Sequence, residues 1–226
     1  FFMKIEKPNN LSEISNKKVS NFIYEEIKDV KSPQILEFGV RAGHSTKFFL
    51  DICKKNKGKC FSVDMNDYSD LFDDENWKFI HSKDDDYSFI KSQIPKQFDV
   101  IFLDTLHEAK HVEKIIYNYY EMLKPNGLFI VDDISWVPYL KNSWRDNFNL
   151  ETENRKTFEL LIDIFMTNQN NIKLDFTFTA SGLAKIKKIS NNSLNKNEHV
   201  QSRIYSLRNF FKQIKKKIIK NWKSAF

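Results

Sequence analysis

Short apolar segments that alternate with helix-like segments are the feature of this 226-residue sequence that most constrains its fold. Two of these segments, Phe98–Asp104 and Leu128–Asp132, are nearly all apolar in their middle. A continuous apolar run of this length is typical of a strand that is buried on both faces. Such strands occur in parallel sheets that helices cover on both sides. The alternation therefore predicts an α/β protein with a mostly parallel sheet.

The strand-like segments number seven, and the last two form a predicted antiparallel hairpin. In chain order they are Gln34–Phe38, Lys59–Asp64, Trp77–His81, Phe98–Asp104, Leu128–Asp132, Ile172–Phe178 and Leu183–Lys187. Predicted helices cover residues 19–30, 45–55, 85–93, 108–123 and 153–166. Strand–helix units in succession predict a doubly wound sheet with helices on both faces. Lys124–Gly127 contains the proline and glycine that typically end a helix, so the fifth strand is expected to follow it.

The chain divides into four predicted parts. Residues 1–31 contain a lead-in helix, 32–190 form the main domain, 191–200 are a polar linker and 201–226 are a basic tail. The tail holds eight of the 36 Lys and Arg residues and no acid, which leaves 28 basic residues against 30 acidic ones elsewhere. The body is therefore slightly acidic, and the overall charge of +6 does not indicate a nucleic-acid-binding surface.

The tail is predicted to be an amphipathic helix, because apolar residues recur in it every three or four positions. These residues are Ile204, Leu207, Phe211, Ile214, Ile218 and Trp222. A basic helix of this kind suits an anionic membrane surface or a partner subunit, which includes a second copy of the chain. Binding to RNA is disfavoured by the acidic body. The alternative is a helix that covers the sheet of its own domain.

The expected cellular compartment is inferred from membrane and secretion signals that the sequence lacks. No apolar run is long enough to span a bilayer, and the first residues do not resemble a secretory signal. Cys53 and Cys60 show neither metal-ligand spacing nor a disulfide framework, so both are expected to be small core residues. We therefore expect a cytoplasmic protein that the tail could bring to a membrane surface.

The first candidate site follows the first predicted strand. Glu37 ends this strand, and Gly39 and Gly43 lie in the turn before a helix that starts near Ser45. In doubly wound folds ligands bind at the carboxyl ends of the strands, where glycine lets the backbone approach them. Asp64 ends the second strand, where a carboxylate can accept both hydroxyls of a ribose. The turn alone is a weak signal, because a tight turn with nothing bound has the same pattern.

Acidic residues also follow the fourth and fifth predicted strands. Asp104 ends the fourth strand, with His107 three residues later, and Asp132 and Asp133 end the fifth. Since neighbouring parallel strands end at the same edge, we expect three carboxylates to converge. Like charges this close are costly unless a cation balances them, and Mg²⁺ prefers such oxygen ligands. The alternative is that one or two of these acids cap helices or pair with Lys or Arg.

These motifs resemble the class I S-adenosylmethionine-dependent methyltransferases over about residues 32–188. The P-loop and dinucleotide-binding patterns do not fit, because the Gly-Lys-Ser/Thr sequence and a third glycine are both missing. The resemblance implies a cofactor site formed by strand ends and turns. Its residues would be Glu37, Gly39, Gly43 and Ser45 at the methionine part, Asp64 at the ribose, Asp84 or Asp85 near the adenine, and Asp104.

The acids after strands four and five resemble those of the cation-dependent O-methyltransferases, in particular the bacterial sugar and macrolide-glycoside branch. That resemblance implies that Asp104, Asp132 and Asp133 hold a divalent cation, with Mg²⁺ expected, and that Asp104 and His107 are catalytic. A neutral imidazole can take a proton from a hydroxyl near neutral pH. Alternatively, His107 only orients Asp104 or starts a helix. His111 lies off the apolar stripe of its helix and is expected to be solvated.

We therefore expect an enzyme that methylates a hydroxyl of a small molecule or sugar, with a cation bound to the acceptor oxygen. The loop that contains Trp144 and Arg145 is a candidate cover for the acceptor. One alternative is a nucleic-acid methyltransferase, although neither an Asn/Asp-Pro-Pro-Tyr nor a Pro-Cys motif follows strand four. The other is a non-catalytic protein of the same fold anchored by its tail, which the intact Asp and His set disfavours.

Overall fold

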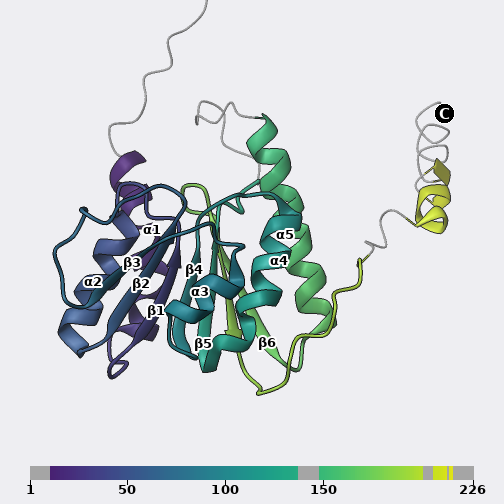
Figure 1. The fold of residues 1–226 in the computed structure, drawn as a ribbon. Coiled ribbons are helices and arrows are strands. Elements are labelled where there is room, and N and C mark those ends of the chain that lie inside the picture. The colour runs from purple at the N-terminus through teal and green to yellow at the C-terminus, as the bar shows by residue number, and fades with distance from the viewer. Residues whose placement is uncertain (1–10, 137–147, 201–205, 213, 216–226) are drawn as a thin grey trace, which may run out of the picture.

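A seven-stranded sheet forms the centre of the computed structural model, which describes residues 11–136, 148–200, 206–212 and 214–215 (Figure 1). The strands are β1 (Gln34–Phe38), β2 (Lys59–Asp64), β3 (Trp77–His81), β4 (Phe98–Leu103), β5 (Leu123–Asp132), β6 (Ile172–Thr177) and β7 (Leu183–Lys188). Their order in the sheet is β3-β2-β1-β4-β5-β7-β6. The first five strands pair in parallel, and β7 pairs antiparallel with both β5 and β6. The predicted doubly wound sheet with a C-terminal hairpin is confirmed.

Helices cover both faces of this sheet. One face packs against α1 (Leu11–Ile27) and α2 (His44–Asn56), and the other against α3 (Tyr87–Gln93), α4 (Ala109–Tyr119), the short 3₁₀ helix η1 (Tyr120–Met122) and α5 (Phe148–Thr167). Successive residues of β1 show the consequence: Ile35 is buried on the α1–α2 side and Leu36 on the α4–α5 side. Burial on both faces explains why the central strands are mostly apolar.

The boundary between α4 and β5 differs from the prediction. The helix expected over 108–123 ends at Tyr119 and continues as η1, and β5 begins at Leu123 rather than Leu128. Asn126 has a φ of 64°, and the register of β5 shifts against β4 near Phe98. The turn-forming residues therefore sit within an irregular first half of β5 instead of preceding the strand, because a bulge accommodates them at the end of the sheet.

Segments expected to flank the main domain contact it closely. Val19, Ile23 and Ile27 of α1 are buried in the same core as α2, and Cys53 and Cys60 are buried as well. In the predicted linker, the carbonyl of Asn195 accepts a hydrogen bond from the Tyr117 hydroxyl at 2.8 Å. The lead-in helix is thus part of the packed domain.

Two predicted features fall largely outside the described residues. Trp144 and Arg145 lie outside them, as does much of the 201–226 tail. Within the tail, residues 207–212 and 214–215 are helical, and the side chains of Leu207 and Phe211 are exposed. No helix in the described part of the chain is long and apolar enough to cross a bilayer.

Candidate active site

Glu37 lies at the end of β1, fully buried beneath the turn that leads to α2. Three hydroxyls donate hydrogen bonds to its carboxylate: Ser45 to Oε1 at 2.6 Å, and Thr46 and Ser62 to Oε2 at 2.7 Å each. Burial raises the pKa of Glu37 to about 7, against the opposite effect of these hydrogen bonds. Ser45, which the resemblance places at the methionine carboxylate, uses its hydroxyl for Glu37.

Gly39 and Gly43 shape the turn after Glu37. Gly39 has a φ of 93°, and a Cβ atom there would lie 1.9 Å from the carbonyl oxygen of Asp104. Gly43 has a φ of 71°, and a Cβ atom there would lie 2.6 Å from the side chain of Leu71. Both positions therefore require glycine. The turn brings the end of β1 against the end of β4, at the edge where ligands bind in such folds.

A pocket of about 690 Å³, the larger pocket, opens beside this turn. Asp64 lies in its wall, where Oδ2 accepts the Val40 N–H at 2.8 Å and Oδ1 accepts the Asn66 N–H at 2.9 Å. These bonds fix the carboxylate, and each oxygen retains a lone pair for a ligand hydroxyl. The predicted cofactor residues that line the larger pocket are Gly39, Asp64, Asp84, Asp85 and Asp104.

Asp84 is held by two side chains that the sequence did not connect with it. Its Oδ2 accepts a hydrogen bond from the Thr105 hydroxyl and lies 2.7 Å from Nε2 of His111. The expectation that His111 is solvated is therefore wrong: its side chain is only 15% exposed and lines the larger pocket. Helical periodicity identifies the side of α4 that faces the core, but not the loop after β3 that covers the other side. Asp85 instead pairs with Lys114 at 2.9 Å.

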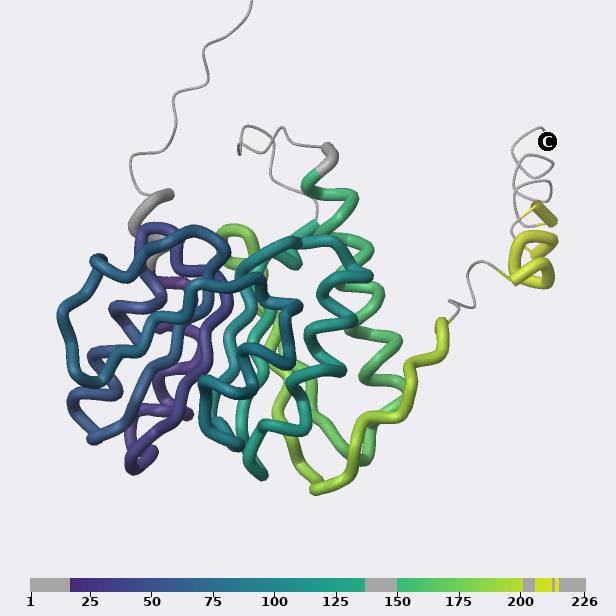
Figure 2. The backbone as a smooth tube through the Cα atoms, in the orientation of Figure 1, coloured from purple at the N-terminus to yellow at the C-terminus, as the bar shows by residue number. Residues whose placement is uncertain are grey.

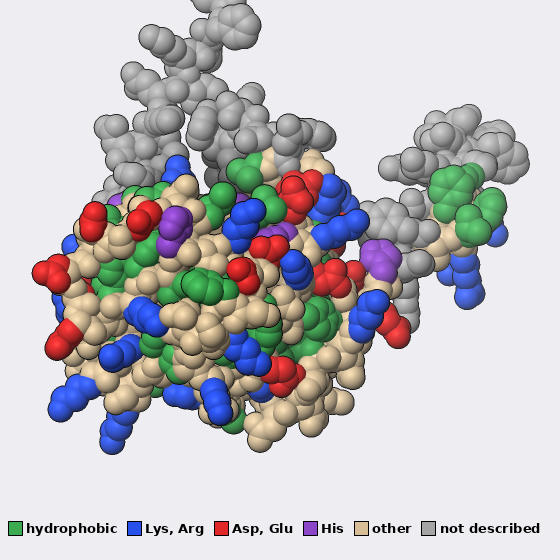
Figure 3. Space-filling model, viewed as in Figure 1, with side chains coloured by type: hydrophobic (Ala, Val, Ile, Leu, Met, Phe, Trp, Pro, Cys, Tyr) green, Lys and Arg blue, Asp and Glu red, His purple; other side chains and the backbone are tan. Residues whose placement is uncertain are grey.

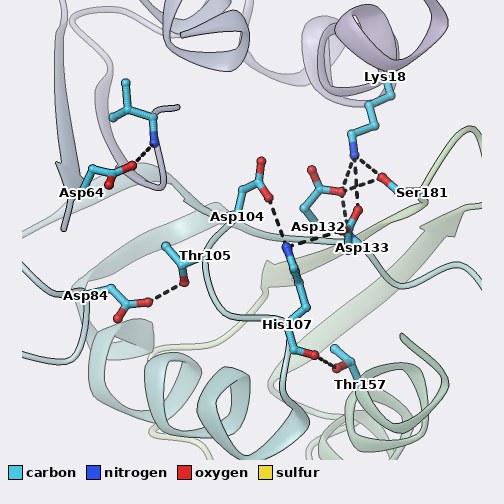
Figure 4. A network of polar contacts seen from close by, with 11 residues as sticks. Lys18, Asp64, Asp84, Asp104, Thr105, His107, Asp132, Asp133, Thr157 and Ser181 are labelled. Atoms are coloured by element: carbon cyan, nitrogen blue, oxygen red, sulfur yellow. Dashed lines mark hydrogen bonds and ion pairs between the residues drawn. The ribbon is translucent and has the colours of Figure 1, made fainter. Parts of the chain in front are cut away.

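A second pocket of about 440 Å³, the smaller pocket, adjoins the first, and Arg41 and Asp104 line both. His107 Nε2 lies there, 3.5 Å from Oδ1 of Asp104 and 3.4 Å from Oδ2 of Asp133 (Figure 4). Asp132 lies beside Asp133 in the same wall. The structure thus brings together the four residues predicted after β4 and β5. Figure 3 shows acidic side chains and histidines near the upper edge of the molecule, where these strands end.

Lys18 of α1 enters the same cluster. Its ammonium group donates hydrogen bonds to the carboxylate of Asp132 and to the hydroxyl of Ser181, and lies 3.8 Å from Oδ1 of Asp133 (Figure 4). The Lys18 side chain is only 8% exposed. No motif points to it, since the predicted helix begins one residue later. Figure 2 shows why: α1 and the segment before β7, far apart in sequence, reach the same edge of the sheet.

Burial governs the electrostatics of this cluster. It raises the pKa of Asp132, an effect that the charge of Asp104 increases and that the ion pair with Lys18 opposes. Burial also raises the pKa of Asp104 to about 6, with a further contribution from Asp133, although 40% of the Asp104 side chain opens into the pockets. The cluster therefore favours any positive charge that lies within it.

Lys18 and His107 already lie among the carboxylates predicted to hold a divalent cation. Asp132 Oδ1 accepts from Lys18 and from the Asp133 N–H, the latter at 2.5 Å. Among the residues that the structure describes, no three His, Cys, Asp or Glu side chains are arranged to hold a metal ion. The arrangement thus does not fit a bound cation, and Mg²⁺ at Asp104, Asp132 and Asp133 stays a prediction from resemblance.

Comparison with known proteins agrees with this fold. Residues 36–134, which run from within β1 to just past β5, match the family model of a methyltransferase domain. The chain has the fold of the class I S-adenosylmethionine-dependent methyltransferases. No curated protein sequence matches the chain.

Solved structures with this methyltransferase fold share little sequence with the chain. MycE methyltransferase from the mycinamycin biosynthetic pathway, in complex with Mg, SAH and mycinamycin VI, is 19% identical over 83% of this chain and 56% of its own, with a TM-score of 0.58. A caffeoyl-CoA O-methyltransferase candidate from Staphylococcus aureus is 19% identical over 82% and 86%, with a TM-score of 0.56. An rRNA-methylase candidate from Clostridium thermocellum is 16% identical over 83% and 99%, with a TM-score of 0.56. The chain spans less than two thirds of MycE.

Proposed function

We propose that the protein transfers a methyl group from S-adenosylmethionine to a hydroxyl of a small molecule or sugar. The observation that carries this proposal is the adjacency of the two pockets, which share Arg41 and Asp104. A methyl donor in the larger pocket and an acceptor in the smaller one would meet beside Asp104. Holding two reactants in contact in this way supplies much of the rate of a group transfer.

The larger pocket suits the nucleoside part of the donor. Asp64, held by two backbone N–H groups, can accept the ribose hydroxyls, and Asp84 with His111 offers polar atoms for an adenine. Gly39 keeps the backbone open where the donor would approach Asp104. When bound, S-adenosylmethionine supplies an electrophilic methyl group.

The smaller pocket suits an acceptor hydroxyl. Nε2 of His107 is within reach of the pocket, and the carbonyl of His107 accepts a hydrogen bond from Thr157 of α5 at 3.4 Å, which positions the residue. The acceptor oxygen would form the new bond to the methyl carbon as the bond from that carbon to the donor sulfur breaks and S-adenosylhomocysteine leaves, while the hydroxyl proton passes to His107. The carboxylates of Asp104 and Asp133 would stabilise the resulting imidazolium.

Assistance by a divalent cation is a separate part of the sequence-based hypothesis. Mg accompanies SAH in the MycE complex, and three carboxylates here supply the oxygen atoms that Mg²⁺ prefers. The ammonium group of Lys18 nevertheless already pairs with the Asp132 carboxylate, so the steps above assign no role to a divalent cation.

Methylation of RNA is the second candidate, because one structural neighbour is an rRNA-methylase candidate. The smaller pocket weighs against it: Lys18 and Arg41 only partly offset the charges of the three acids that line this pocket, so the lining offers a phosphate backbone little attraction. A neutral hydroxyl compound or sugar suits this lining better.

The proposal is tested by incubating the protein with methyl-labelled S-adenosylmethionine and three acceptor classes: a simple catechol, a simple glycoside and a structured RNA. Mass spectrometry then locates the label. We expect it on an oxygen of a non-nucleic-acid acceptor, and we expect His107→Gln to lower kcat by roughly 10²- to 10⁴-fold without changing SAH affinity in calorimetry. Label on RNA, or unchanged turnover by His107→Gln, would contradict the proposal.

A further inference from the structure

A lysine buried among carboxylates is the least expected feature of this domain. Lys18 keeps 8% of its side chain exposed and Asp132 keeps 3%, so the ion pair between them is shielded from water. Ser181 accepts a second hydrogen bond from the same ammonium group. A lysine on a helix that borders the surface usually extends into solvent, because burying a charge is costly unless it is paired.

The backbone around Lys18 holds the ammonium group in place. Val19 and Ile23, on the same helix, are 5% and 0% exposed in the core that α1 shares with α2 and the sheet. On the other side, backbone bonds at 3.1 Å and 2.8 Å tie Asp133 to Gly182 and Ser135 to Ser181. Lys18 and its two partners are therefore supplied by three packed segments.

This placement has a direct consequence for cation binding. The Asp132 oxygen that Lys18 contacts is the same atom that accepts the Asp133 N–H, and Lys18 also lies 3.8 Å from the Asp133 carboxylate. A divalent cation that used both acids would lie close to the ammonium group and meet its repulsion. It could bind only after Lys18 moved out of its buried position.

We propose that Lys18 is the resident cation of this site, balancing the carboxylates of Asp132 and Asp133, and that Lys18 and a divalent cation exclude each other there. The smaller pocket, which Lys18 lines together with His107, then works with a fixed ammonium donor. If the proposed hydroxyl transfer is correct, the remaining N–H of Lys18 is available to the acceptor oxygen. The exclusion of cations does not depend on that transfer.

The test measures cation binding without any methyl donor or acceptor. Mn²⁺ is titrated into wild-type protein, Lys18→Met and the control Lys17→Met, with binding followed by calorimetry and by the electron paramagnetic resonance signal of free Mn²⁺. Methionine retains the length of lysine without its charge, and the control removes the same charge from the adjacent, exposed position. We expect Lys18→Met to bind Mn²⁺ roughly tenfold or more tightly than the other two proteins. Adding Asp132→Asn to Lys18→Met should abolish the gain.

Saturable Mn²⁺ binding by the wild type, as tight as by Lys18→Met, would overturn the proposal. If Lys18→Met does not fold, the melting temperature of the wild type with and without Mn²⁺ tests the proposal. An unchanged melting temperature between millimolar Mn²⁺ and chelator supports the exclusion, and a clear rise with Mn²⁺ refutes it. Failure of the methyl-transfer proposal would be seen only in the turnover assay, so the two ideas can fail separately.

Discussion

Replacing Glu37 with glutamine should change how the stability of this protein depends on pH. The pKa of Glu37 rises from 4.5 to about 7 through burial, and one pKa unit corresponds to about 1.4 kcal/mol, so ionising this residue in the folded protein costs about 3 kcal/mol. The folded state holds the proton more tightly than the unfolded state. The stabilisation of the folded state by the protonated Glu37 carboxyl is thus fully present below pH 4.5 and is lost as the pH rises through about 7.

The assay is urea unfolding of wild type and Glu37→Gln at several pH values between 5 and 8, at constant ionic strength. Glutamine does not ionise, so the variant should not lose this stabilisation. Its free energy of unfolding should therefore rise relative to that of the wild type by about 2–3 kcal/mol between pH 5 and 8. Asp132 affects both proteins and cancels in the difference, whereas Asp104, whose pKa the charge of Glu37 helps to raise, leaves a smaller contribution.

Glu26→Gln is the matched control. Burial acts to raise the pKa of Glu26, but the hydrogen bond and charge of Lys185 hold this pKa below its ordinary value. The stabilisation that the Glu26 carboxylate contributes is therefore lost only as the pH falls through that lowered pKa. The difference in free energy of unfolding between Glu26→Gln and the wild type should thus stay constant between pH 5 and 8. Parallel curves for wild type and Glu37→Gln would refute the reasoning about the buried carboxyl.

Three further predictions concern the glycine turn, the larger pocket and the tail. Gly39→Ala should lower the free energy of unfolding by about 2 kcal/mol or more, measured by urea denaturation, because its Cβ meets a backbone oxygen; unchanged stability would contradict the close approach of β1 to β4. Asp64→Ala should weaken SAH binding roughly tenfold or more in calorimetry, whereas Asp67→Ala, an exposed acid of the next loop, should not. We also propose that the basic tail binds anionic membranes, so removal of residues 201–226 should abolish salt-sensitive co-sedimentation with phosphatidylserine vesicles; equal sedimentation of both proteins would show that the tail is not the anchor.

The sheet could be predicted from the amino-acid sequence, because burial on both faces leaves a pattern that is visible locally. Continuous apolar runs such as Val100–Leu103 predict buried parallel strands, and the carboxyl ends of adjacent parallel strands must share an edge. That rule predicted the meeting of Asp104, Asp132 and Asp133, which the structure shows. The start of β5 escaped prediction, since proline and glycine punctuate a helix end and a strand bulge alike.

The surroundings of those acids depend on tertiary packing. Lys18 reaches Asp132 across 114 positions of sequence, and His111 reaches Asp84 across 27. Periodicity reports which side of a helix faces the core, but it carries no information about which distant segment covers the other side. The carboxylate cluster was therefore predictable from the sequence, whereas the charge that balances it was not, because that charge comes from packing between segments with no local pattern in common.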